Sequence, residues 1–309
     1  MIHAYLILTC STPEKTNIQV KRLQSGNHCF FIHFDQKLRI DTNDPYYKEL
    51  AAQTNVVILK KRINVQWGSF RIVEATVGLI REALKHKNVS YLHLLSGECL
   101  TVKSASYISN YFERNNGKEF IDNFIMPESS AEHSLTYRRL DKYHFHSYFN
   151  PRSPKIKDKL IKNVNSVFRK MQKILKKAGI YRRYSGHYPR LNAGSQWWSL
   201  SYGACQYLVT YIDQNPKFYE RFKYTQVSDE ILFQTIIMNS PFAEKVVNDN
   251  LRFLHFGKNG AYAEPLTMEH LGDLKNENVL FARKFTKDSE SLLSFLERYI
   301  YRQTKQPMH

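Results

Sequence analysis

The 309-residue sequence predicts an α/β protein with a mostly parallel sheet flanked by helices. Its first hundred residues alternate between short apolar runs, typical of buried strands, and longer segments with helical periodicity. Strand, helix and strand at this spacing favour parallel strands joined by covering helices. Strands are expected at 3–9, 28–34, 56–59 and 91–95, and helices at 13–24, 69–86 and 104–115.

The ends of the predicted strands indicate where a ligand would bind. In parallel α/β sheets, ligands bind beyond the carboxyl ends of the strands. Thr9, Asp35 and Glu98 follow three of the predicted strands, and Trp67 precedes the helix at 69–86. We therefore expect these four residues to lie along one rim of the sheet.

The most biased segment runs from residue 152 to residue 183, with twelve Lys or Arg and one acid, Asp158. Apolar residues recur in it every three or four positions, which predicts an amphipathic helix with a basic outer face. They are Ile156, Leu160, Val164, Val167, Met171, Ile174 and Leu175.

The chain is expected to form one domain, 1–309, with 121–190 as a basic, partly helical insert. Further helices are expected at 202–214, 228–238 and 289–301, and a short strand or loop at 279–285.

Charge and hydropathy restrict the class of protein. Lys and Arg outnumber Asp and Glu by 45 to 28, a net charge of +17 that attracts polyanions such as nucleic acid, anionic lipid or phosphorylated substrates. We expect no nucleic-acid partner, because the charge is concentrated in one segment and no nucleic-acid-binding motif occurs.

The apolar runs of the sequence fall far short of the roughly 20 residues that cross a bilayer. The N-terminus lacks the charged start of an export signal, so a cytoplasmic protein is expected.

The cysteines give no sign of a metal site. Cys10, Cys29, Cys99 and Cys205 are far apart and form no CxxC or Cys/His spacing. We expect all four to be small buried side chains in a reducing compartment.

Two adjacent carboxylates, Asp229 and Glu230, stand in the first turn of the helix expected at 228–238. One interpretation is capping, with Ser228 accepting backbone N–H bonds and the acids stabilising the positive end of the helix. The other is catalysis. Apolar residues follow Glu230 directly, and a desolvating wall would raise the pKa of its carboxyl and make it a better base. For Asp229 both interpretations stay open.

Three cations and two tryptophans complete the candidate groups. Arg283 and Lys284 lie inside an apolar hexapeptide, and Arg252 also has apolar neighbours. Cations held in such a frame suit a diphosphate. Trp197 and Trp198 are adjacent, so in an extended segment they point to opposite faces, one to the core and one toward a sugar or base.

Seven segments, in order along nearly the whole chain, resemble the family of core-2/I-branching N-acetylglucosaminyltransferases and peptide O-xylosyltransferases. They are AYLILTCS, FIHFDQK, INVQWGSFRIVEAT, YLHLLSGECLTVKS, GSQWWSLS, SDEILFQTIIMNSPF and LFARKF. The match is poorest between Glu119 and Arg190. The resemblance implies a GT-A fold, which is a nucleotide-sugar-binding α/β sandwich, and transfer with inversion.

The resemblance also implies that no metal or other cofactor is needed. Most GT-A enzymes bind a metal through Asp-x-Asp, but here the corresponding strand ends in Ser-Gly-Glu-Cys. Glu98 is a lone carboxylate there and departs from the family's usual Asp. One carboxylate is a poor clamp for Mg²⁺ on a diphosphate.

The resemblance assigns roles residue by residue. Glu230 falls on the catalytic base. The positions expected to contact a UDP-sugar donor are Leu8, Asp35, Gln66, Trp67, Gln196, Trp197, Arg252, Arg283 and Lys284, of which the last three neutralise the diphosphate. The positions expected to contact the acceptor are Glu98, Arg138, Arg139, Tyr143 and Trp198. For Asp35 there is an alternative, a turn-forming Asp after a strand.

The predicted function is transfer of N-acetylglucosamine or xylose from a UDP-sugar to a hydroxyl of a glycan acceptor. We expect a bacterial enzyme of surface polysaccharide biosynthesis. The basic insert either packs its apolar stripe on the core or docks the enzyme on an anionic membrane, at the inner face of the plasma membrane, where the acceptor is lipid-linked. The alternative function is a basic nucleic-acid-binding or membrane-surface protein without transferase activity.

Overall fold

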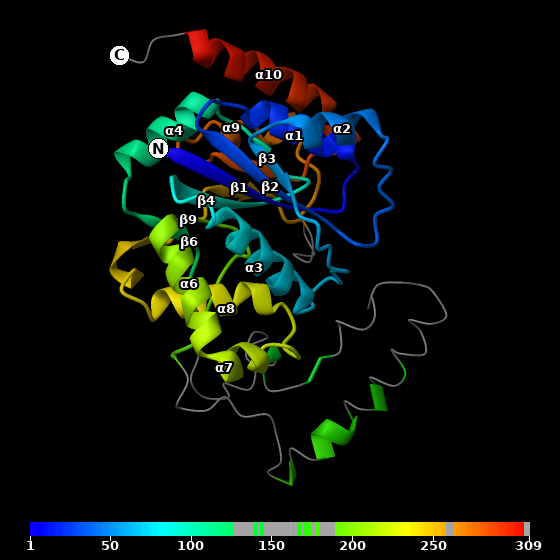
Figure 1. Cartoon of the computed structure of the whole chain (residues 1–309), viewed down its shortest axis with the longest axis vertical. Helices are drawn as coiled ribbons and strands as arrows, with labels where there is room; N and C mark the ends of the chain where they lie inside the picture. Colours follow the sequence, from blue (N-terminus) through cyan, green and yellow to red (C-terminus); the bar gives the residue numbers. More distant parts are fainter. Residues whose placement is uncertain are drawn as a thin grey trace.

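The computed structural model describes residues 1–126, 189–257 and 263–305, together with residues 139, 140, 143, 144, 163, 166, 167, 170–174, 177 and 178. A seven-stranded sheet forms the centre, in the order β10-β6-β9-β4-β1-β2-β3 (Figure 1). Its strands in that order are β10 (Val246–Val247), β6 (Glu119–Ile121), β9 (Trp198–Ser201), β4 (Val89–Ser96), β1 (Ile2–Thr9), β2 (His28–Phe34) and β3 (Val56–Ile58). The pairs β4–β1, β1–β2 and β2–β3 are parallel, and β9 runs antiparallel to β4 and β6.

Both faces of this sheet are buried, as the apolar strand segments predict. Along β1, Ala4 and Leu6 belong to one hydrophobic core and Tyr5 and Ile7 to the other. Figure 1 shows α1, α2 and α4 on one side of the sheet and α3, α6 and α8 on the other. These helices are α1 (Pro13–Leu23), α2 (Pro45–Ala52), α3 (Arg71–Ala83), α4 (Ala105–Arg114), α6 (Tyr202–Gln214) and α8 (Leu232–Met238). The predicted sandwich of a mostly parallel sheet between helices is confirmed.

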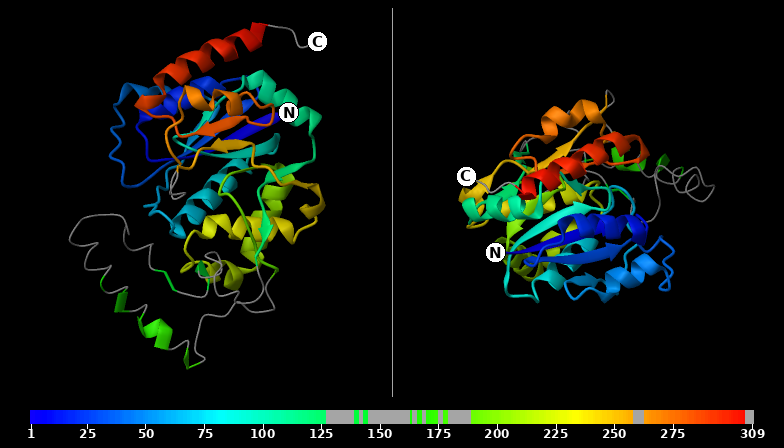
Figure 2. Two further views of the ribbon diagram at one scale, coloured as in Figure 1. Left: turned by 180° about the vertical axis from the view of Figure 1, so that it is seen from behind. Right: turned by 90° about the horizontal axis from the view of Figure 1, so that it is seen from above.

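A three-stranded sheet extends the rim of the large one. It has the order β11-β12-β5, with strands β11 (Arg252–Leu254), β12 (Phe281–Arg283) and β5 (Leu100–Thr101). A third core packs beneath it, supported by α9 (Leu271–Leu274) and α10 (Glu290–Lys305). In Figure 2, α10 lies outermost at one end of the molecule. The short pair β7 (Phe124–Ile125) and β8 (Asn192–Ala193) forms the remaining two-stranded sheet of the described residues.

One predicted helix is divided. The segment expected to be helical at 228–238 consists of a 3₁₀ turn, η2 (Ser228–Glu230), followed by α8. Val227, just before the turn, has a left-handed backbone with φ of 49°. The hydroxyl of Ser228 is buried and has no hydrogen-bond partner among the described residues. The interpretation of Ser228 as a cap is therefore wrong, because Val227 occupies the cap position and Ser228 lies inside the 3₁₀ turn.

The basic insert is described only in part. Residues 163, 166, 167, 170–174 and 177 are helical, which confirms the predicted helix for these positions. Val167, Met171 and Ile174 are 69%, 43% and 68% exposed. For these three side chains, packing of the apolar stripe on the core is wrong, whereas Ile156, Leu160, Val164 and Leu175 lie outside the described residues. None of the helices in the described ranges is long and apolar enough to cross a membrane.

Candidate active site

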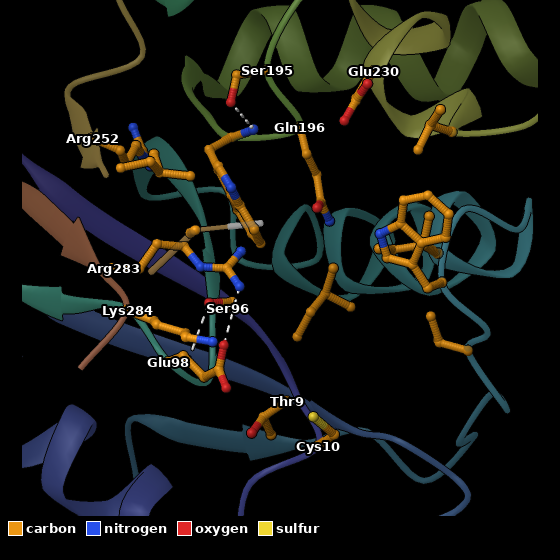
Figure 3. Close-up of a pocket in the computed structure, with 18 of the residues that line it drawn as sticks. Thr9, Cys10, Ser96, Glu98, Ser195, Gln196, Glu230, Arg252, Arg283 and Lys284 are labelled. Carbon is orange, nitrogen blue, oxygen red and sulfur yellow. Dashed lines mark hydrogen bonds and ion pairs between the residues drawn. The ribbon is translucent and has the colours of Figure 1, made fainter. Parts of the chain in front are cut away.

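A pocket of about 1060 Å³ opens at the carboxyl ends of β1, β2 and β4 (Figure 3). Every residue expected to contact the donor lines it, and so do Glu230, Glu98 and Arg139. The expected rim is confirmed, because Thr9, Asp35, Trp67 and Glu98 all border this pocket.

Close packing fixes the turn after β4. The N–H of Gly97 donates to the carbonyl of Leu8 at 2.9 Å. A Cβ atom on Gly97 would lie 2.1 Å from the hydroxyl oxygen of Thr9, so only glycine fits here. The backbone of Glu98 is thereby held against the end of β1, at the floor of the pocket.

Asp35 forms a turn and also borders the pocket. Its Oδ1 accepts a bond from the backbone N–H of Lys37 at 2.8 Å, and the ammonium of Lys37 lies 3.4 Å from Oδ2. The turn-forming interpretation of Asp35 is thus confirmed. The same position at the strand end leaves Asp35 in the pocket wall, so the turn role is compatible with a donor contact.

Glu230 is held at the pocket by its backbone and by one arginine. The N–H of Gly194 donates to the carbonyl of Glu230 at 2.9 Å, and the N–H of Val227 donates to Gly68 at 2.9 Å. The Arg139 guanidinium lies 2.8 Å from Glu230 Oε2. Burial raises the pKa of the Glu230 carboxyl, and Arg139 opposes this shift. A carboxylate with a raised pKa beside an open pocket is suited to accept a proton.

Asp229 has a different environment from its neighbour. It is 4% exposed and does not line the pocket. Burial, and next the charge of Glu230, raise the pKa of Asp229 to about 8. The raised pKa favours the protonated form of Asp229, whereas Glu230 is the carboxyl that borders the pocket beside Arg139.

Arg283 and Lys284 lie apart from Glu230 in the same pocket (Figure 3). The Arg283 guanidinium lies 5.2 Å from the ring centroid of Trp197, a cation–π contact that orients its plane. Its NH2 group also donates to Glu98 Oε2 at 3.1 Å. The pocket thus combines a base at one end with a pair of cations at the other.

Arg252 borders the pocket but is largely committed to the protein. It is 8% exposed, and its guanidinium donates to the Ser199 hydroxyl at 2.7 Å and to the Trp198 carbonyl at 2.8 Å. It also donates to the carbonyls of Leu94 and Asn250. Burial lowers the pKa of Arg252 to about 10, so it stays charged at neutral pH. Its bonds tie β4, β9 and β11 together at the wall of the pocket.

The residues that contact the acceptor are predicted less accurately than those that line the donor side of the pocket. Trp198 is fully buried, packs against Phe233 in the core and does not line the pocket, so its predicted acceptor contact is wrong. The physical reason is that β9 is an internal strand and directs this ring into the core beside α8. Its neighbour Trp197 does reach the pocket, as expected for one of the two rings. Tyr143 lies outside the pocket lining and packs near Tyr224, and Arg138 lies outside the described residues.

Several lining residues were not foreseen from the sequence, among them Asp122, Ser195 and Asn250. Asp122 follows the end of β6, so the strand-end rule that found Asp35 and Glu98 also applies to it.

The cysteine prediction is half right. All four thiols are free, with Cys99 and Cys205 buried and Cys29 at the border of the core. Cys10 is exposed and lines the pocket, which contradicts its predicted burial. It follows β1 directly, at the rim where the sheet meets the pocket. Within the parts of the chain that the structure describes, no group of three or more His, Cys, Asp or Glu side chains could hold a metal ion.

The sequence matches the Core-2/I-Branching enzyme family over residues 3–275. No curated protein matches it. Among solved structures, mouse xyloside xylosyltransferase 1 in its apo form is similar with a TM-score of 0.40 and 10% identity, covering 93% of this chain and 98% of that one. Core-mannan synthase A from Aspergillus fumigatus, in a Mn/GDP form, has a TM-score of 0.33 and 12% identity, covering 79% of this chain and 71% of that one. The family match spans most of the chain: this protein belongs to the core-2/I-branching enzyme family and is a glycosyltransferase that uses a nucleotide sugar.

Proposed function

We propose that the protein transfers N-acetylglucosamine or xylose from a UDP-sugar to a glycan hydroxyl, with inversion and without a metal. One observation carries this proposal. A single pocket holds a carboxyl of raised pKa, Glu230, and a separate pair of cations, Arg283 and Lys284. An inverting transfer needs a base for the acceptor hydroxyl and positive charge for the leaving diphosphate, at separate positions. The alternative of a protein without transferase activity is wrong, because the chain is a glycosyltransferase.

The proposed reaction is one in-line displacement. Glu230 takes the proton of the acceptor hydroxyl while that oxygen attacks the anomeric carbon and the bond to UDP breaks. Positioned base catalysis is typically worth about 10²–10⁴-fold in rate. The negative charge that develops on the diphosphate is stabilised by Arg283 and Lys284, while Arg252 adds positive charge from behind them.

The other lining residues divide between donor and acceptor in this proposal. Asp35, Gln66, Trp67 and Gln196 address the uridine and the sugar of the donor. Arg139 is placed for the acceptor, because its bond to Glu230 puts its guanidinium beside the proposed base. Bonding to Arg139 also restricts the carboxylate to one orientation.

The metal-free proposal rests on Arg283 and Lys284 standing where a diphosphate would otherwise need a divalent ion. Transfer and slow hydrolysis should proceed at the same rate with EDTA as without it. The measurement is a panel of UDP-sugars, each assayed for UDP release in EDTA, which also identifies the donor sugar. A preparation that loses activity in EDTA and regains it with Mn²⁺ or Mg²⁺ would contradict the metal-free account.

We also propose that the enzyme is a bacterial, cytoplasmic protein that docks on the inner face of the plasma membrane and acts on a lipid-linked acceptor in surface polysaccharide synthesis. The support is the described part of the insert helix. Its apolar Val167, Met171 and Ile174 are exposed beside basic side chains. Apolar groups with adjacent Lys residues suit an anionic membrane surface, where each cation contributes about 1 kcal/mol.

Vesicle co-sedimentation tests this docking. The protein should sediment with vesicles that contain anionic phosphatidylserine and less with neutral phosphatidylcholine, and the difference should shrink as salt is raised. Charge reversal at the exposed Lys170, Lys173 and Lys177 should release it without changing donor hydrolysis. Matched reversal of three exposed lysines outside the insert, Lys85, Lys87 and Lys118, should leave it bound. Wild-type protein that ignores anionic vesicles even at low salt would contradict membrane docking.

A further inference from the structure

The arginine proposed for the diphosphate already has a carboxylate partner within the pocket. Arg283 NH2 donates to Glu98 Oε2 at 3.1 Å, and their side chains are 22% and 44% exposed. The pair joins the turn after β4 to the last residue of β12, two segments 185 positions apart. Since both groups line the pocket, any anion that approaches Arg283 meets the charge of Glu98 as well.

We propose that Glu98 is the resident counter-ion of Arg283 and sets the affinity for the nucleoside diphosphate. This inference rests on the proposed function. In the empty pocket the Glu98 carboxylate neutralises Arg283. When the donor binds, the diphosphate displaces this carboxylate, and when UDP leaves, the carboxylate returns. Glu98 thus weakens donor and product binding alike and favours release of UDP.

The geometry allows Glu98 to move while Arg283 stays. Arg283 is held by its stacking on Trp197 and by its place in β12. The backbone of Glu98 is fixed by the close contact of Gly97 with Thr9, but its carboxylate is nearly half exposed. Swinging this side chain into water keeps the carboxylate solvated. The exchange therefore has a small cost, because a partly exposed ion pair contributes little to stability.

A diphosphate is the better partner for the cation pair. It carries more negative charge than a carboxylate and can contact Lys284 and Arg283 together. The negative charge of Glu98 also acts on a group other than Arg283. Burial is the first cause of the raised pKa of the Cys10 thiol, and Glu98 is the next.

The test is calorimetric titration of UDP and of uridine into wild type, Glu98→Gln and Glu98→Asp. Glu98→Gln keeps the shape and removes the charge, so UDP should bind about five- to tenfold more tightly. Uridine, which has no phosphate, should bind equally to both. Glu98→Asp keeps a charge but is one methylene shorter on a fixed backbone, so UDP should bind about two- to threefold more tightly.

Asp213→Asn is the matched control, since Asp213 bonds Arg81 at 3.0 Å and neither residue lines the pocket. Its UDP affinity should equal that of wild type. If wild type binds UDP and Glu98→Gln binds it equally or more weakly, the inference is overturned. If wild type does not bind UDP at all, the proposed function itself is overturned. Should Glu98→Gln lose its thermal unfolding transition, the Glu98→Asp titration takes its place. The inference is then overturned if Glu98→Asp binds UDP as tightly as wild type or more weakly.

Discussion

Replacing Glu230 by Gln should abolish nearly all transfer. The amide has the shape of the carboxylate but cannot accept the proton of the acceptor hydroxyl, so turnover should fall about 10²–10⁴-fold. The donor site lies at the other end of the pocket, around Arg283 and Lys284, and should be unaffected (Figure 3). Turnover with saturating donor and acceptor is the quantity to measure.

The neighbouring carboxyl provides the control for this variant. Asp229 is buried and does not line the pocket, and burial raises the pKa of its carboxyl, which favours the protonated form. Asn is a close mimic of a protonated Asp, so Asp229→Asn should keep most of the wild-type turnover. A loss as large as that of Glu230→Gln would show that the two carboxyls act as a unit.

The second large effect is expected at Lys284. Replacing it by Ala removes one of the two cations proposed for the diphosphate, and the rate of transfer should fall about 10²–10³-fold. UDP affinity should fall about tenfold or more, because bonds to charged groups contribute more than neutral ones. Uridine affinity should stay unchanged. Turnover and the two dissociation constants, measured together, separate the charge effect from a general loss of the site.

Lys287 supplies a matched control for that experiment. It lies three residues further along the chain, is exposed and does not line the pocket. Lys287→Ala should bind UDP as wild type does. If Lys284→Ala weakens UDP and uridine by the same factor, the proposed contact with the diphosphate is wrong.

Much of the fold could be predicted because its central strands are buried on both sides. Residues of β1 alternate between two cores, as with Ala4 and Tyr5, so the strand appears in the sequence as one apolar run. The strand ends could be predicted with it, which placed Thr9, Asp35 and Glu98 at one rim. Parallel strands bring their carboxyl ends together, so local pattern was sufficient for this part of the site.

What depended on tertiary contacts could not be predicted. Val227, with a left-handed backbone, takes the cap position and leaves Ser228 inside the 3₁₀ turn, although the local residues favour Ser228 as the cap. Trp197 and Trp198 are equivalent in sequence, and the position of β9 inside the sheet decides which of them is core. The bond of Glu98 to Arg283 joins the turn after β4 to β12, 185 positions apart in the sequence, so no local pattern could indicate it.

Glu230 is proposed to take part in the chemistry of transfer and not to hold the donor. The most direct test measures UDP affinity and sugar transfer on the same preparation of Glu230→Gln. We expect a UDP dissociation constant equal to that of wild type, with transfer reduced at least about 10²-fold. Residual transfer above about a tenth of the wild-type rate, or a loss of UDP affinity that matches the loss of rate, would contradict it.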